Sequence, residues 1–201
     1  MKLAIININN GNIMSVANMV DSLNCEYEII EDPRKLIEFD KAILPGVGSF
    51  DKVISRVEPW SEYLHRFIQA ENKKFLGICV GLQMLFSESE EGKKKGLSFI
   101  PGKVKKINHE NRSLKVPHMG WNTICDQKES GIFKEFDENP RFYFVHSYHV
   151  VPEDESIVTS RVKYGEKLVA SIEYKNIYGV QFHPEKSHKF GKILIKNFIN
   201  A

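Results

Sequence analysis

The sequence predicts an α/β fold of three layers, with helices on both faces of a mostly parallel central sheet and an antiparallel β extension in the C-terminal half. Three observations lead to this prediction. In the first half, short β-rich runs alternate with segments of helical periodicity, as in parallel strands joined by crossover helices. In the second half, five strand-like runs follow one another without a clear helix between them. A closing segment from Ser187 onwards has the apolar face of a helix.

The first half is expected to hold four strands, each followed by a turn or a helix. These strands are expected at 3–8, 27–30, 41–44 and 74–78. Asn12 is expected to cap a first helix, because apolar residues recur behind it at helical spacing. Ser49 is expected to cap a second helix, which Pro59 interrupts because proline lacks a backbone N–H and fits poorly inside a helix.

The second half is expected to form the antiparallel extension. Its strand-like runs lie at 104–107, 142–146, 157–162, 168–174 and 177–182. Short turns without a crossover helix favour antiparallel neighbours. The final helix is expected to bury Phe190, Ile193, Leu194 and Phe198, which recur on one face.

Composition indicates one ordinary globular domain covering 1–201. The 201 residues are 42% hydrophobic, enough for a core without disulfides or a structural metal. The net charge of +2 is too small to indicate nucleic acid or an anionic membrane as a partner. Three cysteines without a CxxC pair suit a reducing compartment, and no signal peptide or apolar stretch of about 18 residues is visible. We therefore expect a cytoplasmic protein.

The segment GICVG at 77–81 is the most informative stretch. A buried strand delivers Cys79 between two glycines at the point where a helix should begin, which is the form of a nucleophile elbow. The helix N-terminus would favour a thiolate there. The alternative is a buried structural cysteine, a common fate of free cysteines.

A second segment, YGVQFHPE at 178–185, ends a predicted strand with His183 and Glu185 two residues apart, and hence on one face of the chain. A nucleophilic thiol needs a base, and the base needs a group that fixes its orientation. Cys79, His183 and Glu185 fit these three roles. A zinc half-site is the alternative, but the Pro-Cys-x-x-Cys that should accompany it is missing, so no metal or other cofactor is expected.

The turn PGVG at 45–48 lies where parallel sheets form their binding crevice. It is either a simple tight turn or, beside Cys79, a source of backbone N–H groups for an oxyanion together with that of Val80. Taken together, the three segments predict acyl transfer through a thioester on Cys79. Spacing and charge alone leave the substrate open between glutamine, a peptide and an ester.

The motifs PGVG at 45–48, GICVGLQ at 77–83 and QFHPEKS at 181–187 resemble those of the class I (triad) glutamine amidotransferases, in the order and spacing of that family. The resemblance implies a flavodoxin-like fold and hydrolysis of L-glutamine to glutamate and ammonia through a thioester on Cys79. It implies Val47 and Val80 as oxyanion donors. The implied contacts to glutamine are Gly48, Gln83, Ser147 and Tyr148.

Two further segments, PHMGWN at 117–122 and YFVHSY at 143–148, resemble the family members that supply ammonia to a separate synthase subunit. This implies a heterodimer with a HisF-type (β/α)8 cyclase, which Trp121, Asn122 and Lys186 would face. His118 and His146 have no carboxylate at a comparable spacing, so they are expected to be structural or interface residues. Trp121 as ordinary core, and Ser147 and Tyr148 as ordinary strand residues, are the alternatives.

One segment departs from the family pattern. Typical members carry Asp-Tyr-Gly-x-Gly-Asn after the first strand, whereas this chain has NINNGN at 7–12. Because the segment is expected near the partner, the departure concerns the ammonia acceptor more than the glutaminase chemistry. The acceptor that the resemblance implies is the substrate of the cyclase in histidine biosynthesis, and the alternative acceptor is a sugar amidated in surface-glycan biosynthesis. A catalytically silent binding module and a free-standing cysteine hydrolase are the alternatives of another class.

Overall fold

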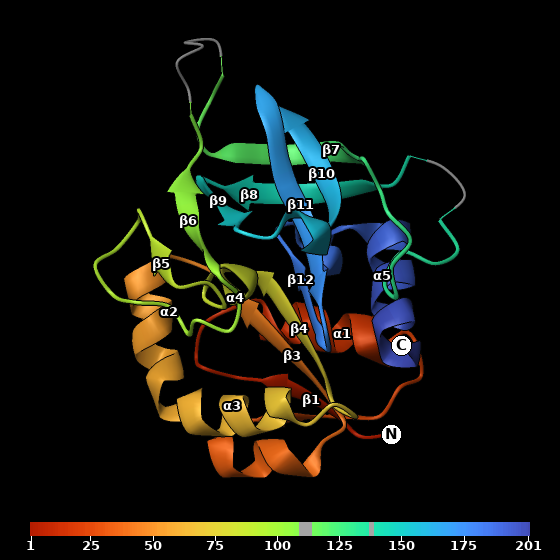
Figure 1. Ribbon diagram of the computed structural model, residues 1–201. Coiled ribbons are helices and arrows are strands. Elements are labelled where there is room, and N and C mark those ends of the chain that lie inside the picture. The colour runs from red at the N-terminus through yellow and green to blue at the C-terminus, as the bar shows by residue number, and fades with distance from the viewer. Residues whose placement is uncertain (109–113, 137–138) are drawn as a thin grey trace.

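The computed structural model describes residues 1–108, 114–136 and 139–201. Nine of its strands form one sheet that crosses the molecule (Figure 1). These strands are β1 (Leu3–Ile6), β2 (Tyr27–Ile30), β3 (Lys41–Gly46), β4 (Lys74–Cys79), β7 (His118–Cys125), β8 (Arg141–His146), β10 (Val158–Tyr164), β11 (Glu166–Tyr174) and β12 (Ile177–Val180). Their order is β2-β1-β3-β4-β12-β11-β10-β7-β8.

The pairing of the strands changes from parallel to antiparallel at β12. The strands β2, β1, β3, β4 and β12 are parallel, and the pairs from β12 through β11, β10 and β7 to β8 are antiparallel. The expected fold class, with a parallel centre and an antiparallel extension, is confirmed. One consequence was not visible in the sequence: β12 lies next to β4, so the end of β12 comes beside the end of the strand that carries Cys79.

Helices cover both faces of the parallel part. On one face, α1 (Ile13–Asp21) packs beside α5 (His188–Asn200), and on the other α3 (Ser61–Gln69) packs beside η1 (Pro33–Glu38), as Figure 1 shows. The helix α2 (Phe50–Val57) is joined to α3 by the 3-10 turn η2 (Glu58–Trp60), so the expected interruption at Pro59 is present. None of the helices within the described ranges is long and apolar enough to span a membrane.

A small second sheet was not expected from the sequence. It has the order β5-β6-β9 and consists of β5 (Glu88–Ser89), β6 (Gly102–Lys106) and β9 (Tyr148–Pro152). A single residue, Ser147, separates β8 in the large sheet from β9 in the small one. The strand β7 was also missed, because only two of its eight side chains are buried and no apolar run marks it.

Several boundaries differ from the prediction. The strand β12 ends at Val180, and β3 continues through Pro45 and Gly46 instead of ending at 44. The 3-10 turn η3 (Glu155–Ile157) takes the first residue of the strand expected from 157. The side chains of Asn12 and Ser49 make no cap hydrogen bond, although each precedes a helix as expected.

Candidate active site

Cys79 stands on a strained turn between β4 and the short helix α4 (Val80–Gln83). Its φ of 56° and ψ of −110° lie in a region that non-glycine residues rarely adopt, and the residue is only 4% exposed. Backbone strain of this kind is typical of functional sites. The expected sharp strand-to-helix turn is therefore present, with the strain on the cysteine itself, and the role of Cys79 as a nucleophile stays a prediction.

The glycines on either side of Cys79 are needed for space and not for their φ angles. A Cβ on Gly77 would lie 2.5 Å from the carbonyl oxygen of Gly81. A Cβ on Gly81 would overlap the carbonyl oxygen of Leu44 in β3. The backbones of β3, β4 and α4 thus meet without an intervening side chain, and this close approach brings the turn after β3 next to Cys79.

We expect Gly81→Ala to lower the free energy of unfolding by about 3 kcal/mol or more, because the added methyl overlaps a backbone atom that has no room to move. Glutamine hydrolysis should fall with it, since relief of the overlap must displace the turn that holds Cys79. Denaturant unfolding and a glutamate-release assay measure the two effects. Wild-type stability together with wild-type turnover would contradict the prediction.

A helix begins directly after Cys79, as expected, and it is short. The segment α4 is a single turn of four residues. A helix this short carries only a small macrodipole, and the expected stabilisation of a thiolate by its N-terminus stays a prediction. The side chains around Cys79 also contribute to its chemistry.

His183 and Glu185 form a buried pair. His183 Nδ1 lies 2.7 Å from Glu185 Oε1, and both side chains are 2% exposed. The same oxygen accepts a hydrogen bond of 2.9 Å from Asn12 Nδ2. Because a carboxylate only accepts, His183 donates through Nδ1, and Nε2 is left to receive a proton. Nε2 is buried and makes no hydrogen bond with any residue that the structure describes.

The expectation that strand alternation brings His183 and Glu185 together is wrong in detail. The strand β12 ends three residues before His183, and Glu185 lies in the 3-10 turn η4 (Pro184–Lys186). His183 is held by a bridge to Tyr143 in β8, whose carbonyl accepts its N–H at 2.9 Å. The tight turn, and not the alternation of a strand, returns the carboxylate to the imidazole.

The electrostatics favour a charged pair. Burial by itself opposes a charged imidazole, but the neighbouring Cys79 and Glu185 outweigh it and raise the pKa of His183 to about 10. Burial would also raise the pKa of Glu185, yet the hydrogen bonds from His183 and Asn12 lower it. His183 can thus hold a proton taken from the thiol while Glu185 balances the charge.

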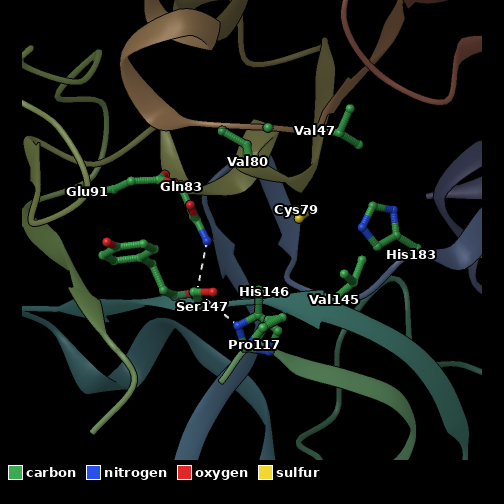
Figure 2. A pocket seen from close by; sticks show the side chains of 12 residues that line it. Val47, Cys79, Val80, Gln83, Glu91, Pro117, Val145, His146, Ser147 and His183 are labelled. Atoms are coloured by element: carbon green, nitrogen blue, oxygen red, sulfur yellow. Dashed lines mark hydrogen bonds between the residues drawn. The ribbon is translucent and has the colours of Figure 1, made fainter. Parts of the chain in front are cut away.

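Cys79 and His183 line one cavity of about 300 Å³. Figure 2 shows the His183 ring facing the Cys79 sulfur. This volume, at the low end for ligand pockets, suits a molecule as small as an amino acid. The cavity is lined by Val47, Gly48, Cys79, Val80, Gln83, Glu91, Pro117, Val145, His146, Ser147, Tyr148 and His183. All the residues expected to contact glutamine or an oxyanion are therefore in the same cavity.

The expected oxyanion donors leave their strands side by side. Gly46 in β3 pairs with Cys79 in β4, so the next residues, Val47 and Val80, follow from adjacent strand ends. Both line the cavity that contains the thiol. This placement supports their assignment as backbone donors to a developing oxyanion, which stays a prediction.

Gln83 is buried and points into the cavity (Figure 2). Its Nε2 donates to the Tyr148 carbonyl at 3.0 Å and to Gln181 Oε1 at 3.0 Å. Both hydrogens of the amide are thus used, and Oε1 is the atom of Gln83 that can receive a donor from a ligand. Gln181 Nε2 in turn lies 3.7 Å from Cys79 Sγ, as a donor to the sulfur.

Two of the three residues expected to face a partner, Trp121 and Lys186, lie on an exposed aromatic patch with Tyr143 and His188. Trp121 is 41% exposed, so it is not ordinary core, and it stacks on His188 with ring centroids 5.3 Å apart. Lys186 is exposed, with Nζ 5.7 Å from the centre of the Tyr143 ring. Asn122 is half-buried, and its carboxamide is used within the chain.

His118 and His146 are buried, 3% and 5% exposed, and lie opposite each other in β7 and β8. His118 Nδ1 is 3.0 Å from His146 Nε2. The nitrogens of the pair bond to each other and to neutral partners. Their assignment as structural residues is consistent with this burial.

We expect the free energy of unfolding to fall as the pH is lowered from about 6.5 to about 4.5. Burial lowers the pKa of His118 to about 4 and that of His146 to about 3. The unfolded chain therefore binds protons in this range that the folded chain excludes, at up to about 1.4 kcal/mol per pH unit for each histidine. His183 adds no slope here, because the stability from a raised pKa is complete below 6.5 and is lost only towards about 10.

Denaturant unfolding over this pH range measures the effect. The double substitution His118→Asn with His146→Asn should reduce the slope, since neither side chain then titrates, while His149, whose pKa burial also lowers, keeps part of it. A wild-type curve without slope between these pH values would contradict the prediction.

Two site residues were missed by sequence reasoning. Asn12 was expected to cap a helix but instead holds Glu185, 173 positions away. Gln181 belongs to the motif at 181–187 and was given no role of its own, although it contacts the thiol. No local signal points to either contact, because each joins elements that only the folded sheet brings together.

The atypical segment after β1 forms a tight turn that Asn7 and Asn9 support. Asn9, in place of the usual first glycine, has a φ of 55°, which asparagine tolerates better than most residues. Asn7, in place of the usual aspartate, accepts the Asn9 N–H at 2.8 Å, as an aspartate could. Both replacements are therefore compatible with this turn.

Comparisons with known proteins agree with the motifs. The family model of Glutamine amidotransferase class-I matches residues 4–201. The imidazole glycerol phosphate synthase subunit HisH of Leptospira borgpetersenii is 41% identical over 200 residues, with 98% of each chain covered. The subunit of the same name from Pelagibacter ubique (strain HTCC1062) is 42% identical over 207 residues, with 100% of each chain covered.

A solved structure agrees as well. The structure of PurLQS from Thermotoga maritima matches with a TM-score of 0.74 at 18% sequence identity. The match covers 99% of this chain and 97% of that one. At this identity the likeness establishes a shared fold.

Proposed function

Because the chain belongs to the class-I glutamine amidotransferases, we propose that it is the glutaminase subunit of an imidazole glycerol phosphate synthase and serves histidine biosynthesis. The observation that carries the chemistry is the strained Cys79 in a cavity with the buried His183–Glu185 pair. Full-length relatives about 40% identical, named as HisH subunits of that synthase, support the pathway.

Glutamine hydrolysis follows from this arrangement in two stages. In the first, the Cys79 sulfur, its proton taken by His183 Nε2, attacks the side-chain carbonyl carbon of L-glutamine. The oxyanion is stabilised by the N–H groups of Val47 and Val80. His183 then returns the proton to the departing nitrogen, so that ammonia leaves and a γ-glutamyl thioester remains on Cys79.

In the second stage, water attacks the thioester carbonyl while His183 takes a proton from it. The carbon–sulfur bond breaks, glutamate leaves, and the thiol recovers its proton. Glu185 stays ionised throughout and holds the imidazole through Nδ1. One glutamine and one water thus give one glutamate and one ammonia, and the atoms balance without a further reactant.

The proposed partner is a HisF-type (β/α)8 cyclase that receives the ammonia. Its proposed docking face includes Trp121 and Lys186, which lie on the exposed aromatic patch around Tyr143. Met119, on the same strand as Trp121, is 61% exposed and adds apolar surface there. Exposed large apolar groups close together are typical of a protein interface.

We expect the isolated chain to hydrolyse glutamine slowly and to be activated, about 100-fold or more, by its synthase subunit carrying the acceptor nucleotide. The proposed reason is that partner binding reorganises the turn at Val47 and completes the oxyanion site. Glutamate release with and without the partner measures this. Transfer of nitrogen from amide-15N glutamine into the imidazole product tests the acceptor.

The substitution Trp121→Ala should weaken the complex, whereas Ile37→Ala should leave it unchanged. Ile37 is similarly exposed, at 47%, but lies in η1 away from β7. Full glutamine turnover by the isolated chain would overturn the proposed activation by the synthase subunit. Absence of 15N from the imidazole product of the complex would overturn the proposed ammonia acceptor.

A further inference from the structure

Two buried histidines, one of which lines the cavity that contains Cys79, take no part in the two stages of hydrolysis. His118 and His146 face each other across β7 and β8. The ring of His118 is stacked between those of Phe144 and Tyr164, with centroids 4.7 and 4.0 Å away and tilts of 20° and 22°. Stacking on both faces leaves only the edge of the ring, with its two nitrogens, for hydrogen bonds.

The partners of the two rings determine where every proton lies. His146 Nδ1 is 2.9 Å from the Tyr148 carbonyl oxygen, which can only accept, so Nδ1 carries a hydrogen. His146 is neutral, so its Nε2 is an acceptor. It therefore receives the hydrogen of His118 Nδ1 at 3.0 Å. His118 Nε2 must then accept, and Asn122 Nδ2 donates to it at 3.3 Å.

The result is a one-way chain of donors from Asn122 through both histidines to the Tyr148 carbonyl. The opposite direction is excluded, because a carbonyl oxygen cannot donate. At its outer end, the chain is anchored by a second hydrogen bond, 3.1 Å long, from Asn122 Nδ2 to the Lys163 carbonyl in β10. Three strands of the antiparallel extension thus hold one chain of hydrogen bonds.

The inner end of the chain reaches the glutamine pocket. The Tyr148 carbonyl accepts from His146 and also from Gln83 Nε2 at 3.0 Å. Gln83 also donates to Gln181 Oε1, and Gln181 Nε2 donates to the Cys79 sulfur. Figure 2 shows Gln83 and His146 converging beside Ser147, where the chain passes from β8 to β9.

We propose that His118 and His146 are positioning residues that hold the Tyr148 carbonyl, and through it the Gln83 carboxamide, in place to bind glutamine. The inference rests on the proposed glutaminase function for its substrate. The Tyr148 carbonyl accepts one hydrogen of Gln83 Nε2, and Gln181 Oε1 accepts the other. These two bonds fix the orientation of the Gln83 carboxamide. Gln83 Oε1 then stays available to a donor on the substrate, such as its ammonium or amide group.

Two substitutions at one position separate this role from simple packing. In His146→Gln, the amide takes the place of Nε2 and can still accept from His118, but the donor to the Tyr148 carbonyl is lost. In His146→Asn, the amide takes the place of Nδ1 and keeps that donor, while the link to His118 is lost. Both replacements are neutral, polar amides at the same buried site.

We expect His146→Gln to raise the KM for L-glutamine about tenfold, the loss typical of one neutral hydrogen bond, with kcat within about threefold of wild type. His146→Asn should raise the KM by a factor at least about threefold smaller than His146→Gln does, because it keeps the donor to the Tyr148 carbonyl. Both are measured as glutamate release by the complex with its synthase subunit. Equal KM increases in the two variants, or none in either, would overturn the proposal.

A measurement on the wild-type protein needs no substitution. In 15N NMR spectra of the histidine-labelled chain, both rings should be neutral with the hydrogen on Nδ1 between pH 6 and 8. Hydrogen on Nε2 of either ring, or a charged ring, would contradict the chain of donors from Asn122 to the Tyr148 carbonyl. If the wild-type complex releases no glutamate, the proposed function is wrong. The NMR result still decides whether the chain of donors through His118 and His146 exists.

Discussion

Replacing Cys79 with alanine is expected to stop glutamine hydrolysis, with a loss of at least about 10⁵-fold, because no other group at the elbow can form the thioester. The fold should survive. Alanine keeps the Cβ, so the left-handed φ of 56° costs it no more than it costs cysteine. The cavity gains one small gap at a buried but cavity-lining position. Glutamate release and denaturant unfolding measure the two expectations.

The matched controls are the two other cysteines. Cys25 and Cys125 are free thiols and only partly buried, and neither lines the cavity. Cys25→Ala and Cys125→Ala should keep wild-type turnover, and Cys79→Ala should keep wild-type affinity for the synthase subunit. Glutamate release by Cys79→Ala at the wild-type rate would refute the assignment of the nucleophile.

Replacing His183 with alanine is expected to reduce the rate of glutamine hydrolysis about as much as loss of the thiol does. The reduction in rate caused by Glu185→Gln should be about tenfold to a hundredfold smaller. The structure gives the reason for this order. Glu185 Oε1 accepts both hydrogen bonds, from His183 and from Asn12, while Oε2 has no partner among the described residues. In the Glu185→Gln variant, the amide oxygen of the new side chain can take the place of Oε1 and keep the His183 imidazole oriented.

What Glu185→Gln removes is the charge. The imidazolium then loses the carboxylate that helps to raise the pKa of His183, so less of it forms beside the thiol. Asn12→Ala serves as the control for orientation, since it removes one hydrogen bond and leaves the charge in place. Single-turnover thioester formation measures the loss. A larger effect from Glu185→Gln than from His183→Ala would show that the roles are assigned wrongly.

The parallel half of the fold was predictable because each of its elements carries a local signal. A strand buried on both faces reads as a continuous apolar run, as in β1 with four buried residues. The same holds for the elbow, since strand, cysteine and glycines are contiguous between Gly77 and Gly81. Function class also followed, because the motifs lie within short segments.

The antiparallel half was predicted less well for a physical reason. The strand β7 is stabilised by β8 and β10 on its two sides, and its own side chains are mostly exposed or half-buried. The strand β9 begins one residue after β8 because the chain changes sheets there, which no local pattern marks. Long-range pairing overrides local propensity in such strands.

The sequence by itself determined the α/β class, the elbow at Cys79 and the resemblance that leads to glutamine. Tertiary structure alone decided how the parts meet. It placed β12 beside β4, which brings His183 to the thiol, and it turned Asn12 onto Glu185 and Gln181 onto Cys79. These contacts join residues about 100 to 170 positions apart, whereas helical and strand periodicity constrain only near neighbours. The order of strands in the sheet therefore makes the site from residues that local patterns leave separate.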